Sequence, residues 1–311
     1  MRIVFLGTPA FAVPTFERIL ERGDDVLLVV TQPDRPKGRG QLLAVSPVKE
    51  AALRAGLPVF QPERVRRPEV VAQLAELRAD AMVVVGYGQI IPQSIIDLPR
   101  YGILNVHASL LPKYRGAAPI QWAVANGETV TGVTTMRIDA GLDTGDMLLR
   151  AETAVGPDET AIELGSRLAV MGADLLGETL DRIEADTLVP EKQDTAQATY
   201  APILKKEDGW IDWRLPALAI HNRVRGLLPW PGGYTKFRGQ TLQIWKARAG
   251  AGGAGKPGSV RCAGKRVEVV CGGGAALELL EVQLEGKKRI AAAAFANGQR
   301  LQDNESFGES I

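Results

Sequence analysis

Short apolar runs alternate with segments of helical periodicity through the first half of the chain, and this alternation restricts the fold more than any other feature. Residues 81–85, Ala-Met-Val-Val-Val, are apolar at every position, as a parallel strand covered on both faces requires. Further strands are predicted at 2–6, 26–31 and 103–107, and helices at 11–22, at 68–78 and after the Ser46-Pro47 pair. We therefore predict a doubly wound α/β domain with a mostly parallel sheet.

The second half of the chain has a different pattern. Apolar side chains recur at three- and four-residue spacing in residues 159–185, which predicts one long helix. Beyond a short predicted helix at 217–228, alternating runs separated by glycines predict a small β-barrel or sandwich, with a flexible Ala/Gly loop at 247–255. The chain is accordingly divided into three parts: a first domain at 1–189, a linker without periodicity at 190–205, and a second domain at 206–311.

Charge is distributed unevenly along the chain, although its net value is only +1. Residues 1–204 hold 20 Lys and Arg against 26 Asp and Glu, whereas residues 205–311 hold 17 against 10. The two parts therefore carry −6 and +7. An excess of cations in one domain predicts contact with a polyanion such as nucleic acid, and the alternative is a charged surface that serves only solubility.

Membrane, disulfide and metal architectures are not indicated. The longest apolar stretches of the 311 residues are far shorter than the roughly 18 to 20 residues of a membrane helix. Cys262 and Cys271 are the only cysteines, and their spacing fits neither a zinc site nor a disulfide framework. Because the chain opens directly on an apolar run, no targeting segment is predicted. We expect a cytoplasmic protein with no metal, no membrane contact and no obligate protein partner.

Two polar residues interrupt the predicted strand at 103–107. Asn105 and His107 are two positions apart, so their side chains project from the same face of that strand. Polar side chains at the end of an otherwise apolar strand cost desolvation energy unless something binds them. Ligands of open α/β sheets bind at the carboxyl ends of the strands, so this position predicts a site.

Histidine occurs only at two positions in the chain, 107 and 221. His221 lies within a predicted helix, where a packing or surface role is expected, so His107 is the better candidate for proton transfer. Its partner carboxylate could come from Asp139, Asp143 or Asp146, and the sequence does not choose among them. With an Asn that donates to an oxyanion and a His that moves a proton, the set suits a transfer or hydrolysis reaction.

Weaker signals come from three Gly- and Pro-rich segments. The segment at 32–40 predicts a surface loop without regular structure, and its cations are Arg35, Lys37 and Arg39. These cations either bind a ligand or are merely solvated. Gly86 and Gly88 either let a flat ligand approach the backbone or end a strand. The turn after residues 2–6 lacks the spacing of dinucleotide and phosphate loops, so a nicotinamide enzyme is disfavoured.

The central motifs carry a resemblance to a known family. Asn105-x-His107, then Ser109-Leu-Leu-Pro-Lys-Tyr-Arg-Gly, then Asp139-Ala-Gly-Leu-Asp-Thr-Gly-Asp resembles the signature of the folate-dependent formyltransferases. The flanking Gln32-Pro-Asp-Arg-Pro and Pro229-Trp-Pro extend the resemblance over nearly the whole chain. It implies a Rossmann-like domain followed by an open OB-like barrel that contacts tRNA. It also implies 10-formyltetrahydrofolate as the formyl donor and the amino group of methionyl initiator tRNA as the acceptor.

The resemblance also implies roles for individual residues. Asn105, His107 and Asp143 would be catalytic. The folate pocket would be lined by two segments: Gly86, Tyr87, Gly88, Gln89, Ile90, Ile91 and Pro92, and Ser109, Leu110, Leu111 and Pro112. The loop cations Arg35, Lys37 and Arg39 would contact the acceptor stem of the tRNA, although Gln41 stands where relatives often have another basic residue.

Three other functions compete with this interpretation. A formyltransferase for an amino-sugar nucleotide or a purine precursor belongs to the same superfamily, but the free two-domain layout favours tRNA. An RNA-binding module without catalysis would have no need of the Asn, His and Asp together. A nicotinamide oxidoreductase is the weakest alternative.

Overall fold

The computed structural model describes residues 1–37, 42–250, 252–264, 266–303 and 305–308. The chain forms two compact units, which are described separately here. The first unit comprises Met1–Gly116, Thr131–Thr153 and Gly165–Tyr200, and the second comprises Ala117–Val130, Ala154–Leu164 and Ala201–Ile311.

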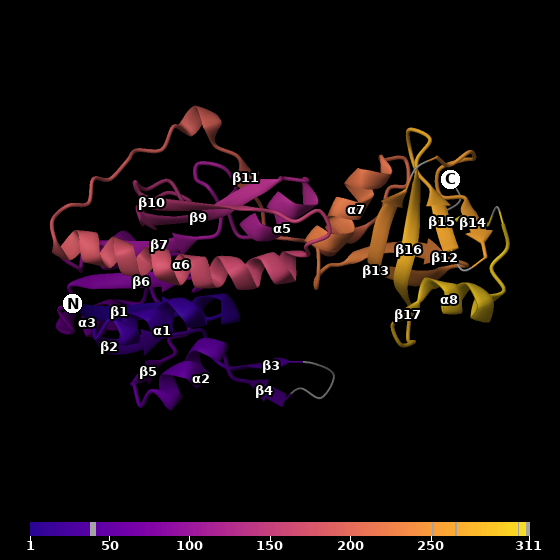
Figure 1. Ribbon diagram of the computed structural model, residues 1–311. Coiled ribbons are helices and arrows are strands. Elements are labelled where there is room, and N and C mark those ends of the chain that lie inside the picture. Colours follow the sequence, from indigo (N-terminus) through magenta and orange to yellow (C-terminus); the bar gives the residue numbers. More distant parts are fainter. Residues whose placement is uncertain (38–41, 251, 265, 304, 309–311) are drawn as a thin grey trace. The chain divides into compact units, whose positions relative to one another are not determined.

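A seven-stranded sheet forms the centre of the first unit (Figure 1). Its strand order is β10-β9-β7-β6-β1-β2-β5. The strands are β1 (Arg2–Gly7), β2 (Asp25–Val30), β5 (Val59–Phe60), β6 (Ala81–Val85), β7 (Ile103–His107), β9 (Val130–Arg137) and β10 (Met147–Ala154). From β5 across to β7 neighbouring strands pair in parallel, while β9 runs antiparallel to β7. The predicted mostly parallel sheet is thus confirmed.

Helices cover both faces of this sheet. They are α1 (Val13–Glu21), α2 (Pro47–Arg54), α3 (Pro68–Glu76), α4 (Gln93–Ile96) and α6 (Ala161–Glu184), with a one-turn 3₁₀ helix, η1, at Ala10–Ala12. On β1, Phe5 packs on Phe16 of α1, with ring centroids 5.3 Å apart, whereas Val4 joins Leu74 of α3 in a separate cluster. Successive residues of β1 therefore pack against the helices on opposite faces of the sheet. Ser46 caps α2 as predicted, since its hydroxyl accepts from the Lys49 amide at 3.1 Å.

The long helix α6 matches the predicted periodicity and runs along the sheet (Figure 1). Its Gly172 faces β7 and β9, where a Cβ atom would lie 2.6 Å from a methyl of Val106 and 3.3 Å from one of Val133. A glycine at this position therefore lets the helix approach the strand that carries Asn105 and His107. Arg22 of the α1 C-cap binds Asp181 and Glu184 on α6, which ties the two helices together.

The loop predicted for residues 32–40 differs from the structure. Arg35–Lys37 forms β3, and Leu42–Ala44 forms β4, and the two pair in antiparallel fashion. The rule that Pro and Gly exclude regular structure failed because an isolated two-stranded ribbon consists only of edges, where a proline such as Pro36 is tolerated. Arg39 lies outside the described residues.

An antiparallel sheet dominates the second unit. Its strand order is β12-β13-β16-β15-β14, and β17 (Ile290–Ala291) pairs with β16. The strands are β12 (Gly233–Phe237), β13 (Gln240–Gly250), β14 (Val260–Ala263), β15 (Arg266–Val270) and β16 (Ala276–Leu284). The helices of this unit include α5 (Pro119–Ala125), the 3₁₀ turn η3 (Lys206–Gly209), α7 (Ala217–Gly226) and α8 (Ala292–Gln299). Of the predicted small β-barrel or sandwich, the antiparallel sheet is confirmed, and the helix α8 was not predicted.

The prediction of a flexible loop at 247–255 is wrong for its first four residues. Residues 247–250 continue β13, and Ala249 and Gly250 pair with Leu277 and Ala276 of β16. Backbone hydrogen bonds determine this pairing, so small side chains do not prevent it. His221 on α7 is buried, and its two ring nitrogens lie 3.1 Å from the carbonyl oxygens of Ala247 and Pro157, which accounts for a packing role.

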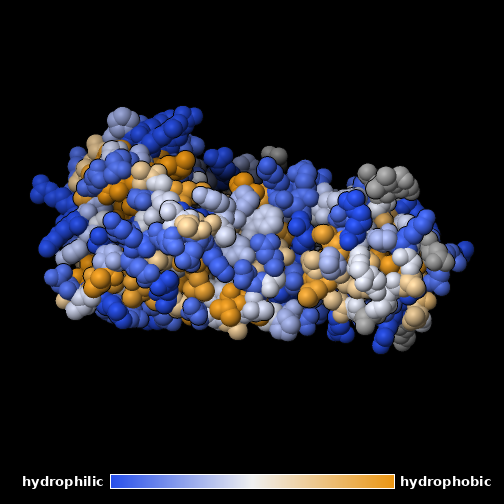
Figure 2. Space-filling view, turned by 90° about the horizontal axis from the view of Figure 1, so that it is seen from above, coloured by the Kyte–Doolittle hydropathy of each residue, from blue (hydrophilic) through white to orange (hydrophobic). Residues whose placement is uncertain are grey.

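Three further elements are short. Arg115–Gly116 forms β8, which pairs with β11 (Tyr200–Ala201), and Thr195–Gln197 forms the 3₁₀ turn η2. Within the described ranges, no helix combines the length and apolar character that crossing a bilayer needs. On the face displayed in Figure 2, hydrophobic residues are scattered among hydrophilic ones.

Candidate active site

Asn105 and His107 both lie on β7, in the interior of the sheet. Both are buried, and they pair with Met136 and Thr134 of the neighbouring strand β9. The remaining residues of β7 are the apolar Ile103, Leu104 and Val106 that a covered strand requires. The two polar side chains therefore occupy a desolvated position at the carboxyl end of the strand, as the sequence predicts.

The imidazole of His107 is oriented by a backbone carbonyl. Its Nε2 atom lies 2.9 Å from the carbonyl oxygen of Tyr114, and a carbonyl oxygen can only accept a hydrogen bond. Nε2 must therefore carry the proton. In the neutral ring, Nδ1 then has a free lone pair, and this atom lies 3.7 Å from Oδ2 of Asp143. That distance is too long for a hydrogen bond but short enough for a charged imidazole to be attracted to the carboxylate.

The sequence offers three acidic residues as partners of His107, and Asp143 is the one that makes the ion-pair contact. Its Oδ2 atom accepts a hydrogen bond from the Gly116 amide at 2.8 Å, and its backbone has φ +52°. Asp139 instead closes its own loop, because its carboxylate accepts from the Gly141 amide and the Thr144 hydroxyl. Gly145 is required here, since a Cβ atom would lie 2.0 Å from the carbonyl oxygen of Arg137.

Gln193 fixes the Asp143 loop from a distant part of the chain. Its amide nitrogen donates to the carbonyl oxygens of Asp143 and Gly145, each at 2.8 Å. Its amide oxygen accepts from Nε and Nη2 of the buried Arg115 at 3.0 and 2.7 Å. Because Arg115 directly precedes Gly116, one side chain links the two segments that position the carboxylate. Nothing in the sequence singles out Gln193, which stands in the non-periodic segment predicted as a linker.

The turn that follows β7 is held by side-chain hydroxyls. Ser109 is buried, and its Oγ donates to the carbonyl oxygen of Lys113 at 2.6 Å. Thr134 of β9 donates to the Ser109 carbonyl oxygen at 2.7 Å and accepts from the Leu111 amide. Leu111 is buried, whereas Leu110 and Pro112 are half-buried. Within this predicted folate segment, Leu110 and Pro112 are therefore the residues that present side-chain surface to a ligand.

The other predicted folate segment, residues 86–92, has two glycines with positive φ, Gly86 at +56° and Gly88 at +86°. Between them the side chain of Tyr87 turns into the core and is only 1% exposed, while its carbonyl oxygen accepts from Thr8 and Gln32. Gln89 also faces the protein, where its Oε1 accepts from the Val65 amide. By contrast, Ile90 is 91% exposed. Ile91 is buried and Pro92 is half-buried.

The remaining predicted residues lie on the β3–β4 ribbon. Arg35 is exposed on β3, the backbone of Lys37 ends that strand, and Arg39 is outside the described residues. In the described part of the chain, no group of three or more His, Cys, Asp or Glu side chains is arranged to hold a metal ion.

Comparison with known proteins identifies the family. Residues 1–180 match the family model described as formyl transferase, and residues 203–300 match the model of the formyl transferase C-terminal domain. A methionyl-tRNA formyltransferase of Solibacter usitatus is 67% identical over 310 residues, which covers 99% of both chains. The chain belongs to the methionyl-tRNA formyltransferase family. Its relative in Koribacter versatilis, of the same name, is 58% identical over 309 residues and 99% of each chain.

A solved structure shares the fold of this family member. WlaRD, a sugar 3N-formyl transferase crystallised in the presence of dTDP and 5-N-formyl-THF, superposes with a TM-score of 0.69. The match covers 93% of this chain and 99% of that one at 19% identity. At that identity the likeness concerns the α/β fold alone.

The Tyr87 hydroxyl generates a prediction about alkaline stability. The hydroxyl is fully buried, it has no hydrogen-bond partner among the residues that the structure describes, and burial raises the Tyr87 pKa from 10 to about 12. The folded chain thus keeps a proton that the unfolded chain loses above pH 10, so stability falls between about pH 10 and 12. We expect Tyr87→Phe to remove up to about 3 kcal/mol of that fall in denaturant unfolding.

The same change should leave stability unchanged or slightly higher at pH 7, because it removes an unpartnered hydroxyl. Burial also raises the Cys271 pKa to about 11, so part of the alkaline loss persists in the variant. Tyr101→Phe, at a half-exposed tyrosine, is the control. A Tyr87→Phe protein with the wild-type profile above pH 10 would contradict the prediction.

The Gln193 contacts generate a second prediction. Gln193→Ala removes four hydrogen bonds and the acceptor of a buried guanidinium, so the free energy of unfolding should fall by about 1–3 kcal/mol. Hydrogen exchange of the Gly116 amide, which Asp143 protects, should become faster. Gln197→Ala is the matched control, since Gln197 is exposed and its side-chain amide donates to the carboxylate of Asp194. Unaltered exchange at Gly116 would show that Gln193 does not hold the loop.

Proposed function

We propose that the chain transfers the formyl group of 10-formyltetrahydrofolate to the amino group of methionyl initiator tRNA, in the cytoplasm. The observation that carries this proposal is the placement of His107 Nδ1 beside the Asp143 carboxylate at the end of the strand that also bears Asn105. An amide donor, a proton acceptor and a stabilising carboxylate are the groups that acyl transfer to an amine needs. Family membership supports the choice of donor and acceptor.

The residues present fit a folate donor. Gly86 and Gly88 are exposed after the carboxyl end of β6, and Pro9 packs on Gly86 while the backbone at Gly88 stays open, so a flat ring can approach it closely. Exposed Ile90 and half-buried Leu110 offer apolar surface beside polar backbone groups, the usual composition of a small-molecule site. Residues 86–92 and 109–112 would hold the folate, which supplies the formyl carbon when bound.

The catalytic residues then have separate tasks. The Asn105 amide would donate a hydrogen bond to the oxygen on which negative charge develops. His107 would take the proton of the attacking amine on Nδ1 and pass it to the folate nitrogen as the bond between that nitrogen and the formyl carbon breaks. Nε2 would keep its own proton throughout, hydrogen-bonded to the Tyr114 carbonyl oxygen. Asp143, held by the Gly116 amide, would stabilise the imidazolium that results. No other group of the chain has to ionise in this scheme.

Acceptor recognition is proposed for the second domain and the β3–β4 ribbon. Residues 1–189 would be the catalytic domain, 190–205 the linker and 206–311 an OB-like tRNA-binding domain. The charge of +7 in residues 205–311 and the antiparallel sheet there support this division. Arg35, Lys37 and Arg39 would contact the acceptor stem.

Transfer of labelled formyl from 10-formyltetrahydrofolate tests the function. We expect the wild-type chain to label methionyl initiator tRNA in strong preference to methionyl elongator tRNA. Asn105→Ala should lower the turnover rate by roughly 100- to 1,000-fold, the usual cost of losing an oxyanion donor. Asp143→Ala should also remove most activity.

Both variants should fold normally, which circular dichroism and thermal unfolding can verify. Exposed Asp139, which contacts its own loop, provides the matched control as Asp139→Asn. Wild-type turnover in Asn105→Ala or Asp143→Ala would remove that residue from its role. Failure of the wild-type chain to label either tRNA would disprove the function.

Salt dependence separates the two substrates. Because cations on the second domain would displace counterions from tRNA, tRNA affinity should fall steeply as salt rises. Folate affinity should change little, since apolar contacts and backbone groups dominate its proposed pocket. Filter binding of tRNA and fluorescence titration of a folate, each between 50 and about 200 mM salt, measure the contrast. Salt-insensitive tRNA binding would contradict the electrostatic account.

A further inference from the structure

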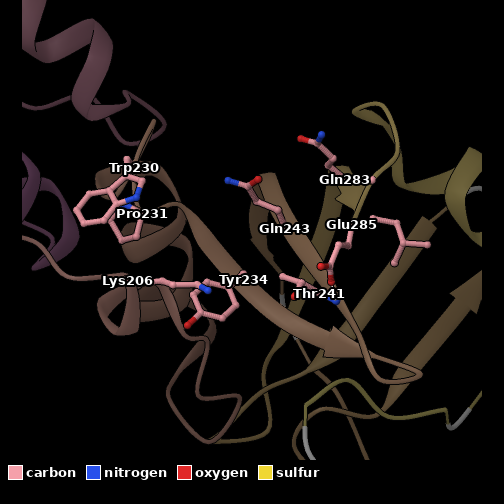
Figure 3. A pocket seen from close by; sticks show the side chains of 10 residues that line it. Lys206, Trp230, Pro231, Tyr234, Thr241, Gln243, Gln283 and Glu285 are labelled. Carbon is pink, nitrogen blue, oxygen red and sulfur yellow. Dashed lines mark hydrogen bonds between the residues drawn. The ribbon is translucent and has the colours of Figure 1, made fainter. Parts of the chain in front are cut away.

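A cavity of about 380 Å³ lies in the second unit (Figure 3), and none of the residues of the proposed mechanism lines it. Its volume falls within the roughly 300–1,000 Å³ of small-molecule sites. Trp230 and Pro231 lie on one side of it, and side chains of β13 and β16 lie on the other. The lining residues are Lys206, Trp230, Pro231, Tyr234, Thr241, Gln243, Gln283, Leu284, Glu285 and Gly286.

Aromatic rings supply the first wall. Trp230 is 55% exposed, which leaves much of a large aromatic surface open. Tyr234 is held in place by Trp210, whose ring lies 5.7 Å away at an angle of 73°. A planar ligand could therefore stack on the Trp230 indole at one side of the cavity.

Amide side chains supply the opposite wall. Gln243 and Gln283 are paired across β13 and β16, so they project from the same face of the sheet. Gln283 already has partners at both ends of its amide, because it accepts from the Trp245 indole at 2.9 Å and donates to the Lys287 carbonyl oxygen at 2.8 Å. In the part of the chain that the structure describes, the Gln243 amide makes no hydrogen bond, so its donor and acceptor are open to a ligand.

Charge divides the cavity from its rim. The Glu285 carboxylate accepts from the backbone amide of Thr241, and this bond, with the Thr241 hydroxyl and nearby lysines, lowers the Glu285 pKa. The ammonium of Lys206 also lines the cavity and offsets this carboxylate, so the lining carries no net charge and favours a neutral group. Lys287 and Lys288, by contrast, are exposed directly after Gly286 of the lining, where an anion outside the cavity can reach them.

We propose that this cavity binds one unpaired nucleotide of the tRNA, and this inference rests on the proposed function. The base would stack on Trp230, the Gln243 amide would contact its hydrogen-bonding edge, and the flanking phosphates would lie near Lys287 and Lys288. This placement matches the distribution of charge. The neutral base lies in the cavity between an indole and an amide, and its phosphates lie outside the cavity near the exposed lysines. Paired bases are excluded, because their faces are covered by stacking within the helix.

Equilibrium binding of initiator tRNA tests the inference, measured by nitrocellulose filtration at two salt concentrations. Trp230→Ala should weaken binding on the order of 10-fold, the usual cost of one stacked base. Trp230→Phe should retain most of the affinity, because a ring remains. Leu218→Ala is the matched control, since Leu218 is 61% exposed in the same unit and does not line the cavity.

The salt dependence identifies which contact is lost. Trp230→Ala should weaken binding equally at both salt concentrations, whereas a Lys287→Ala, Lys288→Ala double variant should flatten the slope. Wild-type affinity in Trp230→Ala overturns the proposal, and so does a Trp230→Phe protein as weak as Trp230→Ala. If Trp230→Ala fails to fold by circular dichroism, Gln243→Ala decides, with several-fold weaker binding expected.

These outcomes are distinct from failure of the proposed function. If the wild-type chain binds and formylates tRNA while Trp230→Ala and Gln243→Ala do so equally well, only the nucleotide pocket is refuted. If the wild-type chain binds no tRNA at all, the proposed function fails first. Retained folate binding in both variants shows that the first domain is intact.

Discussion

The hydrogen bond between His107 Nε2 and the Tyr114 carbonyl oxygen sets the chemistry of the whole site. It fixes the tautomer, and so the lone pair of the ring lies on the side of Asp143. The backbone of Tyr114, whose carbonyl oxygen accepts this bond, has φ +60°, which is rare for a bulky residue. The Thr199 hydroxyl accepts from its amide at 2.8 Å and helps to hold this conformation. A strained turn is thus maintained where the proton acceptor needs it.

Sequence patterns predicted the elements that carry strong local signals. The strand at 81–85 was predictable because it is apolar throughout, and the start of α2 because Ser46-Pro47 combines a cap with a favoured first residue. Asn105 and His107 were found as polar interruptions of an apolar strand. Each of these signals is contained within a few consecutive residues, so no knowledge of distant contacts was needed.

Features that depend on distant contacts could not be predicted. The choice of Asp143 over Asp139 follows from a hydrogen bond to Gly116, 27 residues away in sequence. Gln193 acts through carbonyl oxygens 48 and 50 residues earlier, and a lone glutamine has no pattern that reports this. Pairing of β13 with β16 extends over Ala and Gly because backbone groups make the bonds, whereas side-chain patterns suggested a loop.

The reach of Gln193 determines where the first unit can be cut. A fragment that stops at residue 180, where the N-terminal family match ends, contains Asn105, His107 and Asp143 but neither the amide that grips the Asp143 loop nor the Thr199 hydroxyl beside Tyr114. During synthesis, likewise, Gln193 and Thr199 must be added before the pocket can acquire these contacts. The first unit is therefore completed late, by contacts from a segment of the chain that carries none of the catalytic residues.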